Sequence, residues 1–139
     1  LPEFQELKDM NVKSALEDAE LTFHLAYDKD GNFIGAAVET FTNKGFSGNI
    51  SLMVGILADG TVNNISVLQH AETPGLGSKM SEPSFKDQFN NKHADSFNFN
   101  VKKDGGDVDA ITAATISSRA FCDAVNRAIS TFENNKGGF

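Results

Sequence analysis

One amphipathic segment near the C-terminus, residues 116–133, most limits the folds that this chain can adopt. Placed at 100° per residue, its apolar side chains fill one wide arc of a helix: Ile116, Ala120, Phe121, Ala124, Val125, Ala128, Ile129 and Phe132. Only Ser117 intrudes on this arc, in the first turn, where its hydroxyl can bond a free backbone N–H group or a ligand. We therefore predict a long helix that packs with one face on another element.

Four segments with alternating side chains precede this helix and predict the element on which it packs. They form two pairs, each joined by a turn rich in Asp and Gly, at 21–27 with 33–41 and at 49–57 with 61–69. The sequence therefore predicts an α+β fold, a mainly antiparallel sheet of about four strands built from hairpins, with helices packed on it in one domain.

The other segments give weaker patterns. We predict an ordered loop at 70–79, a short helix at 84–91 and a strand at 97–102. Within residues 1–20 a weak helical pattern runs through Phe4, Leu7, Met10 and Leu16. We treat residues 1–20 as an N-terminal segment and residues 21–139 as the folded domain.

Charge and length exclude several classes of function. The 139 residues are enough for one compact domain and too few for two comfortable ones. The net charge is −7, and no segment concentrates Lys or Arg. Because nucleic-acid binding needs a basic surface, we expect no nucleic-acid partner and no basic membrane-surface patch.

Cysteine and histidine give no sign of a metal centre. The single Cys122 cannot form a disulfide within the chain or supply a Cys-based cluster, and we interpret it as a small packing residue. The three His residues have no partners at metal-ligand spacing, so we predict no metal site. The twelve Phe residues are interpreted as core.

A segment of small and hydroxyl side chains, residues 109–118, leads directly into the predicted helix. The N-terminus of a helix offers free N–H groups and a partial positive charge, which suit a phosphate group. Ala113 and Ala114 leave room for close approach, and Thr112, Thr115 and Ser117 supply oxygens. From the residues alone, the alternative is that these hydroxyls only cap the helix.

The same segment resembles a known motif. Asp109, Thr112, Ala113, Ala114 and Thr115 match Asp-x-x-[Ser/Thr]-Gly-Ala-Thr, the flavinylation motif of the FMN-binding domain family, with Ala113 in place of Gly. That family includes the G subunit of Rnf complexes and the C subunit of sodium-translocating NADH:quinone reductases. The resemblance implies that Thr115 carries FMN through a phosphoester, installed by a flavin transferase that uses FAD.

A second segment supports the same family. The run His-Ala-Glu-Thr-Pro-Gly-Leu-Gly at 70–77 resembles the corresponding loop of Rnf G subunits, and the whole resemblance covers roughly residues 45–132. Leu76 between two glycines can present an apolar face to an isoalloxazine ring, although a tight turn around a buried Leu would use the same residues. The resemblance implies an FMN site built from Glu72, Thr73, Gly75, Leu76, Gly77, Lys79, Thr112, Ala113, Ala114, Ile116 and Ser117.

The resemblance also implies a role. We expect an electron-transfer subunit of an Rnf-type ferredoxin:NAD oxidoreductase, with the other subunits of that membrane complex as partners and without a complete enzymatic turnover of its own. The alternatives are a subunit of a sodium-translocating NADH:quinone reductase, another flavinylated relay, or a binding domain without redox function. The chain begins Leu1-Pro2 without Met, so we expect a missing membrane anchor before it and a periplasmic location for the domain.

Overall fold

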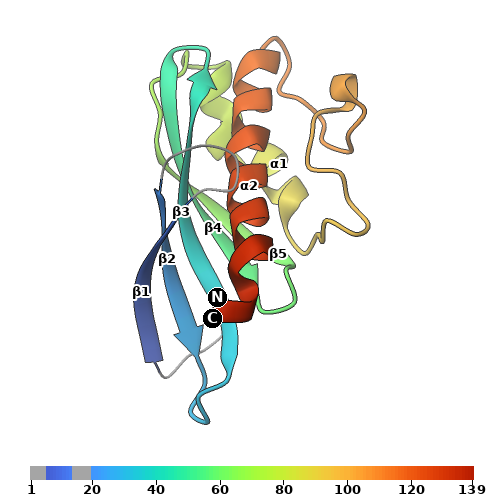
Figure 1. Cartoon of the computed structure of the whole chain (residues 1–139). Helices are drawn as coiled ribbons and strands as arrows, with labels where there is room; N and C mark the ends of the chain where they lie inside the picture. Colours follow the sequence, from blue (N-terminus) through green and yellow to red (C-terminus); the bar gives the residue numbers. More distant parts are fainter. Residues whose placement is uncertain (1–5, 14–19) are drawn as a thin grey trace.

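A computed structural model of the chain describes residues 6–13 and 20–139. Its centre is one antiparallel sheet in which each strand pairs with its neighbours in sequence (Figure 1). The strands are β1 (Glu6–Lys13), β2 (Glu20–Tyr27), β3 (Phe33–Gly45), β4 (Gly48–Leu57) and β5 (Val62–Gln69). This order confirms the predicted meander of hairpins, with one strand more than expected.

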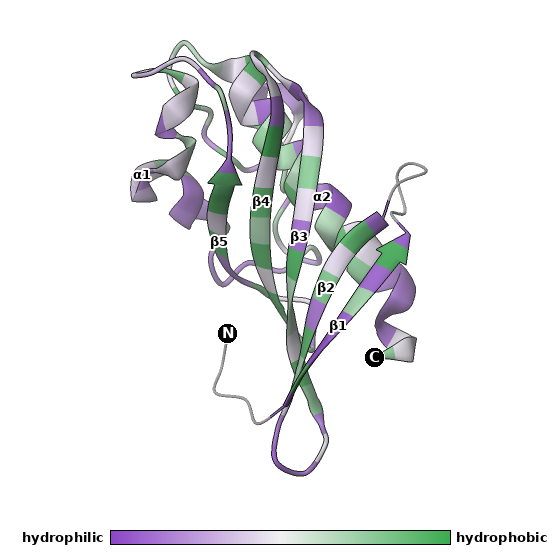
Figure 2. Cartoon of the chain, turned by 90° about the vertical axis from the view of Figure 1, so that its left-hand side faces the viewer, coloured by the Kyte–Doolittle hydropathy of each residue, from purple (hydrophilic) through white to green (hydrophobic). Residues whose placement is uncertain are grey.

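The long helix α2 (Thr115–Asn135) lies along one face of the sheet, where it contacts mainly β3 and β4 (Figures 1 and 2). Helix α2 contains the predicted helix 116–133 and is longer than predicted at both ends. The predicted helix at 84–91 is divided into α1 (Pro83–Lys86) and a 3-10 turn, Asp87–Phe89. Further 3-10 turns lie at Gly77–Ser81, Lys102–Asp104 and Lys136–Gly138. The predicted α+β fold is therefore confirmed.

The core lies between the sheet and α2. Alternate residues of β4 (Ile50, Leu52, Val54 and Ile56) are completely buried, as expected for a strand with one face against a helix. On the helix side, the ring of Phe121 meets those of Phe85 and Phe89 with centroids 4.9 and 5.0 Å apart. Because burying one such side chain contributes about 1.5–3 kcal/mol, these contacts hold α1 and the Asp87–Phe89 turn against α2.

The helical pattern expected near the N-terminus is wrong for the residues that the structure describes. Residues 6–13 form β1, which pairs with β2 from Glu6↔Tyr27 to Lys13↔Glu20. Leu7 and Met10 stay exposed, so their spacing does not mark a buried helix face. Phe4 and Leu16 lie outside the described residues.

The strand predicted at 97–102 is also wrong. Phe99 and Val101 are buried as their alternation suggested, but only Val101 forms a bridge, with Val108. The segment folds back on itself instead: Asp107 N donates to Asn98 O at 3.0 Å. A loop with its own hydrogen bonds thus buries the same residues that a strand would. No helix of the described residues has the length and apolar character needed to cross a bilayer.

Candidate functional site

A pocket of about 340 Å³ lies at the N-terminal end of α2. Three segments that are far apart in sequence form its walls: the turn after β3, the loop before the Gly77–Ser81 turn, and the start of α2. The lining residues are Phe46, Thr73, Leu76, Gly77, Ala113, Ala114, Thr115, Ile116 and Ser117. The fold therefore brings the two sequence motifs together at one cavity.

Three large apolar side chains at the rim of this pocket are exposed to solvent. Phe46, Leu76 and Ile116 are 66%, 39% and 50% exposed, and each comes from a different wall. A cluster of exposed apolar side chains at one cavity often marks a binding site, whereas single exposed apolar side chains are common on any protein surface. Their arrangement suits a planar, largely apolar ligand.

Phe46 corrects the interpretation that the Phe residues are core. It belongs to the turn between β3 and β4, flanked by Gly45 and by Ser47-Gly48, where no strand alternation places a side chain inside. Sequence reasoning did not include it in the site. The available signal was a large aromatic residue inside a Gly- and Ser-rich turn, a position that is normally polar.

The first turn of α2 leaves backbone donors at the pocket. The residue before the helix is Ala114, which has no side-chain oxygen, and no side chain caps this end. The first N–H groups of a helix have no partner within the helix, and they carry its partial positive charge. Thr115, half-buried as the first helical residue, lies at the pocket wall beside these groups. The alternative that the hydroxyls of this segment cap the helix therefore receives no support from this geometry.

Ala113 has a left-handed backbone with φ of 60°. It occupies the position at which the family pattern has Gly, the residue that adopts this conformation without steric cost. For an L-residue with a Cβ the left-handed region costs roughly 1–2 kcal/mol. The turn before Thr115 thus keeps the glycine-type geometry although a methyl group is present.

Ser118 holds this strained turn against the helix. Its Oγ accepts a hydrogen bond from Ile111 N at 2.9 Å and donates one to Ala114 O at 2.9 Å. Ser118 is completely buried, so no water competes for these bonds. Sequence reasoning placed Ser118 in the motif segment without giving it this function. A Ser one turn after the start of a helix is the signal, because its hydroxyl can bond the carbonyl four residues earlier.

Glu72 is a buried carboxylate next to the pocket. It is 4% exposed and accepts hydrogen bonds from Phe46 N and Ser47 N, both at 2.8 Å, and from Ser117 Oγ at 2.6 Å. Burial alone would raise the pKa of Glu72, but the donors Ser117, Ser47 and Phe46, with the nearby His70, lower it overall. Glu72 is therefore held as an anion. It does not line the pocket.

The other predicted site residues lie around the pocket or beyond it. Gly75 lies in the turn of the loop, with φ of 77° and its N–H bonded to Ser78 Oγ at 3.0 Å. Lys79 and Thr112 line a separate cavity of about 250 Å³, which Asp109 also borders. The Asp109 carboxylate pairs with Lys102 Nζ at 2.6 Å. Of the predicted site residues, the structure thus places Thr73, Leu76, Gly77 and residues 113–117 at the lining of one cavity.

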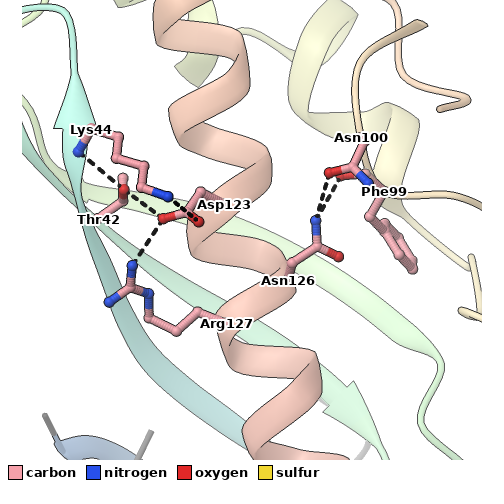
Figure 3. A network of polar contacts seen from close by, with 7 residues as sticks. All are labelled: Thr42, Lys44, Phe99, Asn100, Asp123, Asn126 and Arg127. Atoms are coloured by element: carbon pink, nitrogen blue, oxygen red, sulfur yellow. Dashed lines mark hydrogen bonds and ion pairs between the residues drawn. The ribbon is translucent and has the colours of Figure 1, made fainter. Parts of the chain in front are cut away.

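Polar contacts further along α2 fix the helix that carries the site (Figure 3). Asp123 accepts hydrogen bonds from Thr42 Oγ1 at 2.7 Å and from Lys44 Nζ at 3.4 Å, which tie α2 to β3. On the neighbouring side of the helix, Asn126 Nδ2 donates to Phe99 O at 3.1 Å. These contacts hold α2 between β3 and the loop at 97–109, so the position of Thr115 is set by the fold.

The chain is similar to several proteins that share one name. The chain is 42% identical over 111 residues to the G subunit of the ion-translocating oxidoreductase complex of Shewanella baltica (strain OS223), a match that covers 76% of this chain and 52% of that protein. It is 38% identical over 117 residues to the protein of the same name from Methanosarcina acetivorans, covering 83% of this chain and 60% of that protein. The chain thus spans about half the length of these curated relatives.

A solved structure has the same fold. The C subunit of the Na(+)-translocating NADH-quinone reductase of Parabacteroides distasonis superposes with a TM-score of 0.66 at 21% identity, over 84% of this chain and 63% of that chain. Residues 45–130, which include all three walls of the pocket, match the family described as FMN-binding domain. The chain therefore belongs to the FMN-binding domain family.

Proposed function

We propose that this domain binds one FMN in the pocket rimmed by Phe46, Leu76 and Ile116 and carries it as a phosphoester on Thr115. The observation that carries the proposal is the position of Thr115. It is the first residue of α2 and lines the pocket whose rim is apolar. Phosphate would lie at the free N–H groups of the first helical turn. The ring would lie toward the apolar rim.

The residues present fit such a cofactor. A cavity of about 340 Å³ has the size of a small-molecule site. Ala113 and Ala114 leave space around the Thr115 hydroxyl, and Gly77 places the backbone of the loop directly at the pocket wall. Among the described residues, no ionisable side chain lines the pocket, so the groups available to the ring are apolar side chains, hydroxyl groups and backbone groups.

Attachment at Thr115 requires a flavin transferase and FAD as the donor. In the exchange, a bond forms between Thr115 Oγ and the phosphorus of the FMN half of FAD. The bond from that phosphorus to AMP breaks, AMP leaves, and the hydroxyl proton is released. The domain supplies the accessible hydroxyl and the left-handed turn that precedes it.

Electron relay is the role that this site supports. Bound FMN supplies one- and two-electron redox chemistry, while the protein supplies attachment, orientation and electrostatic environment. The relatives are named as the G subunit of an ion-translocating oxidoreductase complex. We infer that this domain passes electrons between other subunits of an Rnf-type membrane complex, on its periplasmic side, and that it completes no enzymatic turnover alone.

The test is the intact mass of the protein produced together with a flavin transferase. We expect a gain equal to FMN less one water, localised by peptide mapping to Thr115. Thr115→Ala should abolish the gain and keep the fold, whereas the control variant Ser66→Ala, which removes a hydroxyl at an exposed position of β5 outside the pocket and the motif, should keep the gain. A flavin on Thr112 or Ser117 would contradict the assignment. Wild-type protein without flavin would favour a binding domain without redox function.

A further inference from the structure

The Glu72 cluster (Phe46, Ser47, Glu72 and Ser117) joins all three walls of the pocket through one buried carboxylate. Phe46 and Ser47 belong to the turn after β3, Glu72 to the loop, and Ser117 to the first turn of α2. We propose that Glu72 is a positioning residue, whose carboxylate holds these segments in the arrangement that forms the flavin pocket. This inference rests on the proposed function, because it assigns a role in shaping the FMN site.

The number of donors explains why an anion is needed at this position. Phe46 N and Ser117 Oγ both bond to Oε1, and Ser47 N bonds to Oε2. A carboxylate accepts at both oxygens, whereas a Gln amide accepts at one and donates at the other. Hydrogen bonds to an ionised acceptor are also stronger than bonds between neutral groups. Glu72→Gln therefore loses the bond to either Ser47 N or Phe46 N, whichever faces the amide NH2 group, and weakens the others.

The packing at Gly77 is a separate sign that the walls must meet closely here. A Cβ added at Gly77 would overlap Ser117 Oγ and lie 2.7 Å from Glu72 Cβ. Gly77 has no positive φ, so the need for Gly comes from space and not from backbone conformation. The loop thus touches α2 at the same point where Glu72 bonds Ser117, and a methyl group there should separate the two walls.

Glu72 acts through its neighbours and not by contact with a ligand. Its side chain is buried behind the pocket wall and does not line the cavity. Two of the residues that it bonds do line the cavity: Phe46 at the rim and Ser117 beside Thr115. Loss of the carboxylate should therefore change the flavin site by moving Phe46 and the start of α2, while Thr115 keeps its hydroxyl.

The first experiment measures amide hydrogen exchange in protein without flavin. In Glu72→Ala the Phe46 and Ser47 amides lose their acceptor, so their exchange should become faster than in the wild type. Glu82→Gln removes the same charge at an exposed position outside the pocket and should leave both amides protected. Equal protection of the two amides in folded Glu72→Ala, Glu72→Gln and wild-type protein would overturn the inference.

The second experiment measures the flavin site. For Glu72→Gln we expect affinity for free FMN to fall on the order of tenfold, and iodide should quench the fluorescence of the attached flavin more strongly. Ser117→Ala, which keeps the carboxylate, and Gly77→Ala should shift both readouts in the same direction. Ser117→Ala and Gly77→Ala provide the test if the Glu72 variants do not fold. Glu82→Gln should match the wild type.

The outcomes separate the two proposals. Wild-type protein that neither binds FMN nor becomes flavinylated would overturn the proposed function and this inference with it. Wild-type protein that carries flavin, together with Glu72→Gln and Gly77→Ala proteins of unchanged FMN affinity and quenching, would overturn the positioning role alone.

Discussion

The side-chain amide of Gln88 pairs with the backbone of Asp109 on both sides: Nε2 donates to Asp109 O at 3.0 Å, and Oε1 accepts from Asp109 N at 2.8 Å. Asp109 is the first residue of the motif that ends at Thr115. Gln88 thus bonds both backbone groups of Asp109, and it fixes the start of the motif to the 3-10 turn Asp87–Phe89.

Gln88→Ala should therefore loosen the motif segment. The loss of two hydrogen bonds between neutral groups should lower the free energy of unfolding by about 1–2 kcal/mol. We also expect a lower extent of flavinylation at Thr115, because the segment presented to the transferase is less ordered. Urea denaturation and intact mass measure the two effects. Gln69→Ala, at an exposed position at the end of β5, is the control and should change neither. Unchanged values for Gln88→Ala would show that the pairing contributes nothing.

Ala113→Gly should stabilise the protein, because Gly adopts the left-handed backbone at this position without steric cost. The expected gain in unfolding free energy is about 1 kcal/mol. Ala110→Gly, at an exposed position without a positive φ, should instead lose up to about 1 kcal/mol through the larger entropy of the unfolded chain. Denaturation of the two variants is enough to test the left-handed conformation of Ala113, because we expect changes of opposite sign in their free energies of unfolding. If both variants are destabilised equally, the turn before Thr115 does not have this geometry in solution.

Local patterns predicted much of the fold. The period of 3.6 in residues 116–133 and the turn chemistry between strands depend only on near neighbours, so α2 and two hairpins could be read directly. The strand predicted at 97–102 failed because alternation reports which side chains are buried and not which backbone they pair with. The helix expected near the N-terminus failed for a related reason, since β1 depends on pairing with β2.

The candidate site could be predicted only in part. Thr115 and Leu76 were found because each lies in a recognisable short motif. Phe46 and the bonds of Glu72 were missed because they join residues separated by 26 and 45 positions, a separation that no local pattern reports. The left-handed turn at Ala113 was indicated only by the Gly that the family motif has at this position, because Ala gives no conformational signal of its own.

His24 should make stability depend on pH near neutrality. Its ring bonds Asp9 of β1 at 2.6 Å and Glu39 of β3 at 3.2 Å. Burial would lower the pKa of His24, but the hydrogen bonds and charges of these two carboxylates raise it above its ordinary value. The stabilisation is thus complete below the unfolded pKa of about 6.5 and is lost as pH rises through the higher folded pKa.

The measurement is the free energy of unfolding across roughly pH 6 to 8 for wild type and His24→Gln, a window around the ordinary His pKa. We expect wild-type stability to fall with pH relative to the variant. Because Asp9 lies on β1, the protection factors of the β1 amides, corrected for the intrinsic pH dependence of exchange, should also fall with pH in the wild type only. Parallel pH profiles of the two proteins would contradict the role of His24.

Leu76→Asp should shift the reduction potential of the attached flavin to more negative values. Leu76 is 39% exposed at the pocket rim, so an Asp there places a negative charge beside the proposed ring position in a partly dry site. Coulomb repulsion of the reduced, anionic flavin predicts a shift on the order of tens of millivolts, smaller at high salt. Attachment at Thr115 should continue, because the phosphate end of the cofactor lies away from the rim in the proposed arrangement.

Two controls separate charge from other effects in this experiment. Leu76→Asn changes polarity at the same position without adding charge, and Leu68→Asp adds the same charge at an exposed site on β5 outside the pocket. Redox titration of the flavinylated proteins should give a larger negative shift for Leu76→Asp than for either control, and that shift should shrink as salt is added, whereas any shift of Leu76→Asn should not. If the potential of folded Leu76→Asp equals that of Leu68→Asp, Leu76 lies away from the isoalloxazine, and the segment at 70–77 serves as a structural turn.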